Sequence, residues 1–196
     1  MTPGNVDPAR VYLSPADARI LAAAVDRLIP PSDGHPGAAA LGAVDYIDML
    51  LGAFLFDPPR IFAGGPFSGR RGGDASFAAF LPLRPLEELA WRTRVEGSQG
   101  RPEREFNGPV RGWQERYREG IDALGDDFDR VDAGEQDRRL AAAPEFRALL
   151  YGHANEGCYG APEYGGNRDG RGWAAIDFPG DAQPRGYTDE EVSGRA

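Results

Sequence analysis

The stretch SPADARILAAAVDRLIPP, residues 14–31, decides the fold class of this chain. Ser14 can cap a helix, because its side-chain oxygen can accept a hydrogen bond from a backbone N–H of the first turn. Pro15 suits the first helical position, and Asp17 adds an acidic side chain where the helix dipole favours one. Apolar residues then recur at helical spacing until a pair of prolines ends the run. The pattern predicts an amphipathic helix over residues 15–29.

Five more segments carry helical signals of the same kind. The predicted helices cover residues 38–55, 85–95 and 109–128, and two shorter ones begin at Asp132 and Pro144. In the helix over residues 85–95 we expect Leu86, Leu89 and Ala90 to face inward. No stretch alternates strictly enough between apolar and polar residues to predict a strand. We therefore predict an all-α fold, a small domain of five or six helices.

Glycine and proline are unusually frequent, with 27 and 17 copies in 196 residues, against a usual combined share of about 12%. They predict long irregular segments over residues 56–82 and 97–109, and an extended C-terminal coil. Backbone polar groups in such segments need partners, and a second protein can supply them. We divide the chain into an N-terminal extension (1–13), a helical domain (14–156) and a partner-binding tail (157–196). The phenylalanines of the segment 56–82 predict poor solubility of the chain alone.

The composition excludes several classes of function. The net charge is −9, and all 22 basic residues are arginines, so nucleic-acid binding and lysine-dependent covalent catalysis are not expected. One cysteine cannot form an internal disulfide, which suits a reducing compartment. Residues 1–7 lack the basic and apolar regions of a signal peptide, and the apolar run at 20–29 is too short to span a bilayer. We expect no direct membrane insertion and a cytoplasmic location, or a periplasmic one if a leader was removed.

His153 and Glu156 are the strongest candidates for chemistry within the chain. They lie one helical turn apart and could share a metal ion or a proton. Cys158 lies off that face, and His35 is the only other histidine. The simpler interpretation is that this histidine and glutamate pair with each other at a helix end. We predict no catalytic, cofactor-binding or metal site, and a self-standing helical enzyme using His153 and Glu156 stays open as an alternative.

Several short motifs are spaced along the chain. They are LIPPSDGHPGA at 28–38, VDYID at 44–48, EG at 156–157, PEYGGNRD at 162–169, GW at 172–173 and FPG at 178–180. With these motifs the chain, from about residue 14 to residue 180, resembles the gluconate 2-dehydrogenase small-subunit (subunit 3) family.

The resemblance implies a non-catalytic subunit of a dehydrogenase that oxidises sugars, sugar acids or related alcohols. In that family the large subunit is a glucose–methanol–choline-type flavoprotein that holds FAD, often with a multihaem cytochrome c subunit. The small subunit binds the flavoprotein and aids its maturation, so we expect FAD in the partner and no cofactor in this chain. The family's twin-arginine export signal is not found here. A chaperone that releases the flavoprotein after maturation is a further alternative.

The motifs near the C-terminus contain the residues that we expect to bind the partner. These are Glu156, Tyr159, Pro162, Tyr164, Gly165, Gly166, Asn167, Asp169, Trp173 and Phe178. The paired glycines allow a sharp chain reversal. We expect the side chains of Asn167 and Asp169 to hold that reversal through bonds to nearby backbone N–H groups. Alternatively, the turn only closes the chain's own fold.

Overall fold

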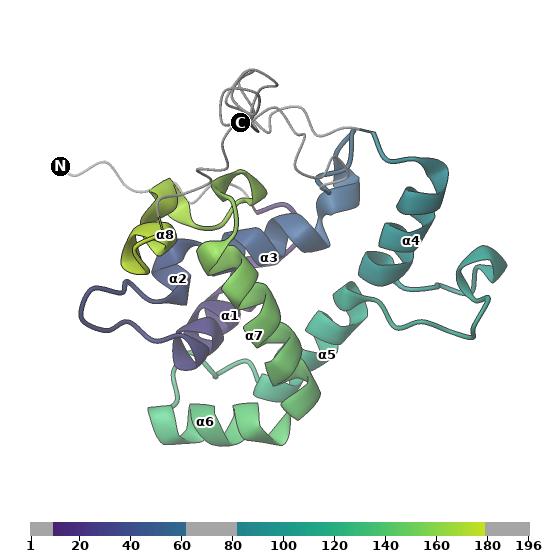
Figure 1. The fold of residues 1–196 in the computed structure, drawn as a ribbon. Coiled ribbons are helices and arrows are strands. Elements are labelled where there is room, and N and C mark those ends of the chain that lie inside the picture. Colours follow the sequence, from purple (N-terminus) through teal and green to yellow (C-terminus); the bar gives the residue numbers. More distant parts are fainter. Residues whose placement is uncertain (1–9, 62–81, 179–196) are drawn as a thin grey trace, which may run out of the picture.

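The computed structural model describes residues 10–61 and 82–178, and the fold of this part is all-α, as predicted (Figure 1). The α-helices are α1 (Pro15–Leu28), α2 (Ala38–Leu41), α3 (Ala43–Leu51), α4 (Pro85–Glu96), α5 (Trp113–Leu124), α6 (Ala133–Ala142), α7 (Pro144–Tyr159) and α8 (Arg171–Ala175). Short 3-10 turns are η1 (Ala53–Leu55), η3 (Pro102–Arg104), η4 (Pro162–Tyr164) and η5 (Arg168–Gly170). None of the helices in the described ranges is long and apolar enough to cross a membrane.

Helix α1 begins as its sequence predicts. The Ser14 hydroxyl accepts a hydrogen bond of 3.1 Å from the Asp17 N–H, and Pro15 occupies the first helical position. The apolar stripe, which includes Leu21 and Val25, is buried. Helix α6 begins in the same way, because the Asp132 side chain accepts from the Glu135 N–H at 3.0 Å.

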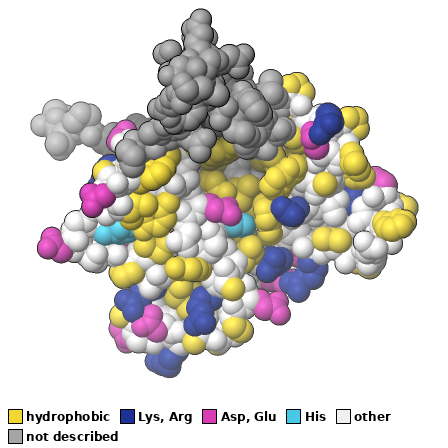
Figure 2. Space-filling view, viewed as in Figure 1, with side chains coloured by type: hydrophobic (Ala, Val, Ile, Leu, Met, Phe, Trp, Pro, Cys, Tyr) yellow, Lys and Arg dark blue, Asp and Glu magenta, His cyan; other side chains and the backbone are white. Residues whose placement is uncertain are grey.

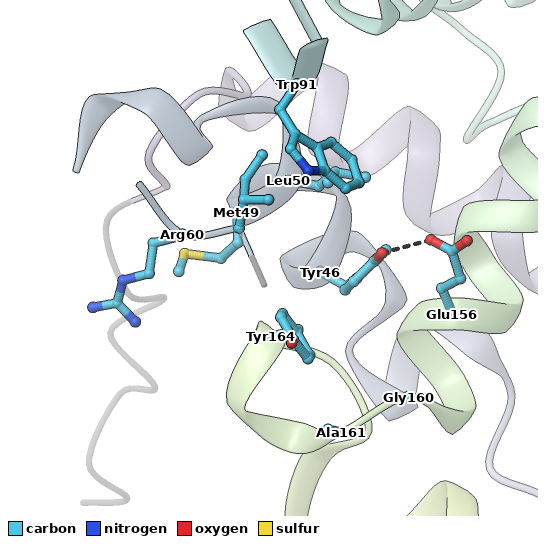
Figure 3. A pocket seen from close by; sticks show the side chains of 10 residues that line it. Tyr46, Met49, Leu50, Arg60, Trp91, Glu156, Gly160, Ala161 and Tyr164 are labelled. Atoms are coloured by element: carbon cyan, nitrogen blue, oxygen red, sulfur yellow. Dashed lines mark hydrogen bonds between the residues drawn. The ribbon is translucent and has the colours of Figure 1, made fainter. Parts of the chain in front are cut away.

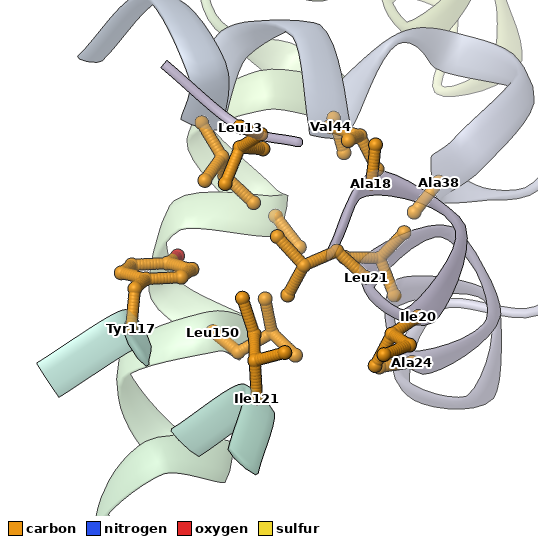
Figure 4. Packing of buried hydrophobic residues seen from close by; sticks show 14 of the residues in the cluster. Leu13, Ala18, Ile20, Leu21, Ala24, Ala38, Val44, Tyr117, Ile121 and Leu150 are labelled. Carbon is orange, nitrogen blue, oxygen red and sulfur yellow. The ribbon is translucent and has the colours of Figure 1, made fainter. Parts of the chain in front are cut away.

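The main core lies between α1, α3, α5 and α7 (Figures 1 and 4). Helix α7 crosses the middle of the molecule and packs along α3, with α2, α5 and α6 also against it. The centre of this core is formed by fully or almost fully buried side chains, among them Leu21, Val44, Tyr117, Ile121 and Leu150. Burying one such side chain contributes roughly 1.5–3 kcal/mol, so this cluster is the main source of stability.

The helix expected over residues 38–55 is divided into α2, α3 and η1, so that prediction is wrong in its continuity. Gly42 is the cause of the first break, since its φ of 89° lies in the left-handed region. Its N–H bonds back to the carbonyl groups of Ala38 and Ala39, which closes α2 and redirects the chain into α3. The apolar face of α3 is nevertheless buried as expected, with Ile47 and Leu51 at its centre.

Helix α4 has its predicted bounds to within one residue, but it turns a different face inward. Leu86 is 76% exposed, and Ala90 is exposed as well. Val95 is buried instead, and with Trp91 it packs against Ala53 and its neighbours in a second, smaller cluster. This difference arises because α4 lies at the margin of the domain, where its main described neighbours are α5, α3 and η3 (Figure 1).

Helix α5 is shorter than the predicted 109–128 segment. Pro109 lies in the preceding loop, and the helix ends at Gly125, whose φ is 88°. Phe128, expected on the helix, is fully buried from the turn that follows it.

The C-terminal segment folds back onto the domain. Helix α7 continues to Tyr159, past the predicted boundary at residue 156, and η4, η5 and α8 follow it in place of an extended coil. These turns contact α3 and α7. Residues 179–196 and most of the 56–82 segment, from 62 to 81, lie outside the described residues, and so do the predictions made for them.

The close crossing of α3 and α7 depends on Gly157. A Cβ atom at this position would lie 2.8 Å from the Ala43 Cα and 3.0 Å from the Tyr46 Cβ. The Gly157 carbonyl also accepts a 2.6 Å hydrogen bond from the Asn167 N–H. Any side chain here therefore pushes α3 and α7 apart and disturbs the turn that rests on them.

We expect Gly157→Ala to lower the free energy of unfolding by about 2 kcal/mol or more, because the contact is with backbone that cannot rotate away. Gly152→Ala is the matched control on the same helix. Beyond the backbone of its own helix, no atom lies within 4 Å of the place that a Cβ would take there, so alanine should raise stability by about 0.5–1 kcal/mol. Urea unfolding of both variants tests this, and effects of the same sign would contradict it.

Candidate functional site

A pocket of about 380 Å³ opens between α3, α4 and the turn that follows α7. Its described lining residues are Tyr46, Met49, Leu50, Arg60, Ile61, Trp91, Glu156, Gly160, Ala161 and Tyr164. Figure 3 shows them from close by, and Figure 2 shows hydrophobic side chains gathered around an acidic one on this face of the molecule. The pocket thus combines an apolar wall with one carboxylate.

The polar centre of the pocket is a pair of side chains from two helices. The Tyr46 hydroxyl on α3 donates a 2.5 Å hydrogen bond to Oε2 of Glu156 on α7 (Figure 3). Burial raises the pKa of Tyr46, and the bond to Glu156 raises it further, so the phenol stays protonated and remains the donor. Glu156 itself is exposed, and this bond holds its carboxylate in one orientation.

Aromatic rings from three elements form the walls of the pocket. Trp91 comes from α4, Tyr46 from α3 and Tyr164 from η4 (Figure 3). Two guanidinium groups lie nearby. That of Arg94 stacks on Trp91 at 5.1 Å from a ring centroid, and that of Arg60 lies 4.9 Å from the Phe56 ring centroid. In Figure 3 the Arg60 side chain points away from Tyr46 and Glu156.

His153 does not pair with Glu156, so the simple interpretation of these two residues is wrong. Its Nδ1 lies 2.9 Å from the Tyr117 hydroxyl, and its ring stacks on Tyr117 and meets the edge of Trp113. Side chains three residues apart on a helix differ by about 60° in direction, so His153 faces α5 while Glu156 faces α3. Burial lowers the pKa of His153 to about 4, with Arg116 adding to the effect.

The described residues contain no group of three histidine, cysteine, aspartate or glutamate side chains that could hold a metal ion. Cys158 is fully buried, and burial raises the pKa of its thiol to about 12. Neither Cys158 nor His153 is therefore placed to react with a substrate.

The predicted chain reversal occurs at Gly165, whose φ is 95°. Gly166 is buried against the Gly157 carbonyl, where a Cβ would lie only 2.2 Å away. Asn167 holds the turn as predicted, since its Oδ1 accepts from the Gly172 N–H at 2.8 Å. Its Nδ2 also donates to the Gly160 carbonyl at 2.8 Å. Asp169 is exposed and makes no such bond to the described residues, so the prediction is wrong for that side chain.

Tyr159 and Trp173 connect the turn to the domain. The Trp173 indole N–H donates to the Tyr159 carbonyl at 2.7 Å, and the Tyr159 hydroxyl lies 2.9 Å from His35 Nε2. Phe178 packs edge-on against Trp173 and is 46% exposed. Among the residues expected to bind a partner, Glu156 and Tyr164 line the pocket while Gly166 and Asn167 are buried within the fold. The buried ones shape the turn, and the exposed ones remain available for contact.

Sequence reasoning did not select Tyr46 or Trp91 as site residues. Tyr46 lies within the VDYID motif at 44–48, so that motif was an available signal. No sequence signal indicated Trp91, because its helix was expected to bury the face that contains Leu86.

The sequence suggested no role for the loop between α4 and α5. In the structure this loop is anchored by buried polar contacts and carries an exposed aromatic ring. Arg104 is buried, ion-paired with Glu96 at 3.0 Å, and donates to the Gly97 carbonyl at 3.0 Å. The Ser98 N–H donates to the Val110 carbonyl at 2.9 Å and closes the base of the loop. Phe106 is 95% exposed between these anchors.

A family model described as gluconate 2-dehydrogenase subunit 3 matches residues 15–180, a range that includes every described residue of the pocket. Searches among curated proteins and among solved structures found no match.

The depressed pKa of His153 predicts a loss of stability in mild acid. The unfolded chain binds a proton at this histidine near pH 6.5, whereas the folded chain does so only near pH 4. Stability from this residue is therefore complete above pH 6.5 and falls by about 3 kcal/mol as the pH drops to 4. Urea unfolding between pH 4 and 7.5 should show this loss in the wild type and not in His153→Asn. Parallel pH profiles would contradict it.

Proposed function

The chain belongs to the gluconate 2-dehydrogenase subunit 3 family, and from this premise we propose that it is a non-catalytic small subunit. It binds and stabilises a large FAD-containing dehydrogenase or oxidase of the glucose–methanol–choline type, which acts on sugars or related alcohols. The observation that carries the proposal is the family match, because it extends over residues 15–180 and so includes nearly all of the described structure.

The groups that a self-standing enzyme would use are poorly placed, which supports an accessory role. His153 is 5% exposed and is kept neutral at pH 7 by burial. Glu156 is bonded to Tyr46 on another helix, so the two candidate residues do not act on one substrate atom. Acid–base catalysis needs both groups within reach of the same reacting centre.

The exposed apolar side chains support a role in binding another protein. Phe106, Ile176 and Phe178 are 95%, 52% and 46% exposed. Aromatic side chains that are already fixed supply large contact areas at little cost in conformational entropy. Phe178 meets this condition, since it packs on Trp173, and Phe106 extends from a loop whose backbone is anchored by Arg104.

Co-expression with candidate FAD-containing dehydrogenase subunits from the same genome tests the proposal. A stable small subunit elutes with the large subunit in gel filtration, in a peak that has flavin absorbance. Haem absorbance in the same peak would reveal a cytochrome c subunit. A flavoprotein that needs the chain for maturation but elutes without it would identify the releasable chaperone. No co-elution, with unchanged flavin content in the absence of the chain, would show the proposal to be wrong.

We expect Phe106→Ala to weaken the complex about tenfold or more, because a buried aromatic anchor contributes about 2 kcal/mol or more to binding. The melting temperature of the lone chain should not change, since the ring is 95% exposed. Phe128→Ala is the contrasting control. That ring is fully buried, so its loss should destabilise the chain by about 3–5 kcal/mol. Calorimetry and surface plasmon resonance separate the two effects, and unaltered affinity for Phe106→Ala would exclude the loop from the interface.

A further inference from the structure

The pocket between α3, α4 and η4 presents a carboxylate among aromatic rings. Glu156 lines it together with the rings of Tyr46, Trp91 and Tyr164, and in Figure 3 the Tyr46 hydroxyl lies next to the Glu156 carboxylate. The face of an aromatic ring carries negative electrostatic potential and attracts ammonium and guanidinium groups. A carboxylate beside such rings adds a full negative charge and a hydrogen-bond acceptor. The combination selects an organic cation.

The Tyr46–Glu156 bond prepares the carboxylate for such a ligand. Tyr46 bonds to Oε2, and an ionised carboxylate accepts hydrogen bonds on both of its oxygens. The bond holds the second oxygen, Oε1, in a fixed place, so little side-chain entropy is lost when a cation binds. The whole chain adds to the attraction, because its net charge is −9.

The basic residue that lines the pocket, Arg60, does not occupy the place beside the Glu156 carboxylate. Arg60 is the one cation among the ten described lining residues, and its guanidinium lies against Phe56. Figure 3 shows it directed away from Glu156. Arg94 stacks on Trp91, and its closest ring contacts are with Trp91 and Trp113. It does not line the pocket.

We propose that this pocket receives an arginine or lysine side chain of the flavoprotein subunit. The inference rests on the proposed function and names the chemistry by which the two subunits recognise each other. The pocket's volume of about 380 Å³ is at the low end of the range of roughly 300–1,000 Å³ for small-molecule sites. One long basic side chain fits this size, with its methylene stem against Met49 and Leu50 and its charged end at Glu156.

The test measures the dissociation constant of the complex for three variants of the full chain. Glu156→Gln removes the charge but keeps an acceptor for Tyr46, so the fold is retained. We expect it to weaken binding about tenfold or more, and Glu156→Lys to weaken it further by direct repulsion. Glu145→Gln makes the same charge change in the first turn of the same helix, about 16 Å away along the axis. It should alter the dissociation constant less than twofold.

Salt provides a second readout. Raising sodium chloride from 50 to 500 mM should weaken the wild-type complex more steeply than the Glu156→Gln complex, because one ion pair is missing from the variant. Urea unfolding of each lone variant establishes that the folded fraction is unchanged.

The outcomes separate this inference from the proposed function. If wild type, Glu156→Gln and Glu145→Gln bind the flavoprotein equally, the cation pocket is wrong and the subunit role stands. If the wild type forms no complex, the subunit role is wrong and the inference falls with it. If the lone wild-type chain dimerises and Glu156→Gln does not, an arginine of a second copy fills the pocket, which also overturns the inference.

Discussion

The contact between α3 and α7 at Gly157 and Ala43 is the constraint on which the rest of the structure depends. Because Gly157 has no side chain, the two helices approach until a Cβ would lie 2.8 Å from the Ala43 Cα. That approach brings Tyr46 within hydrogen-bonding distance of Glu156, one residue before the crossing. It also leaves the Gly157 carbonyl open to the Asn167 N–H. The pocket and the C-terminal turn therefore derive from the same close packing.

Buried polar side chains hold the irregular segments of this fold in place. The Asp48 carboxylate accepts hydrogen bonds from the N–H groups of Val11, Tyr12 and Leu13, at 2.7 to 2.9 Å, and so fixes the chain ahead of α1. Asn167 and Arg104 do the same for the segments after α7 and after α4. Glycine- and proline-rich segments were expected to satisfy their backbone groups on a second protein. In the segments after α4 and after α7, one well-placed side chain satisfies part of that need from within the domain.

These hydrogen bonds within the domain bury some of the residues that were expected to contact a partner. Residues such as Asn167, buried within the fold, contribute by shaping the turn, whereas Glu156, Phe106 and Phe178 present charge or apolar area to the outside. An accessory subunit whose buried residues shape the fold and whose exposed residues contact a partner needs no reactive group of its own. We propose that its recognition chemistry lies in a few exposed side chains on segments that the domain holds in place, which limits the entropy lost when a complex forms.

The sequence by itself determined the helical class and the starts of several helices, because caps and first-turn prolines act within four residues. Ser14, Asp132 and Pro144 each mark a helix start that the structure contains. It also carried the resemblance to the family, which the match over residues 15–180 confirms. Only the tertiary structure decided where Gly42 breaks a helix, which face of α4 is buried and that Trp91 and Glu156 line one pocket. These features depend on contacts between segments far apart in the chain, and helical periodicity specifies an apolar face without specifying what lies against it.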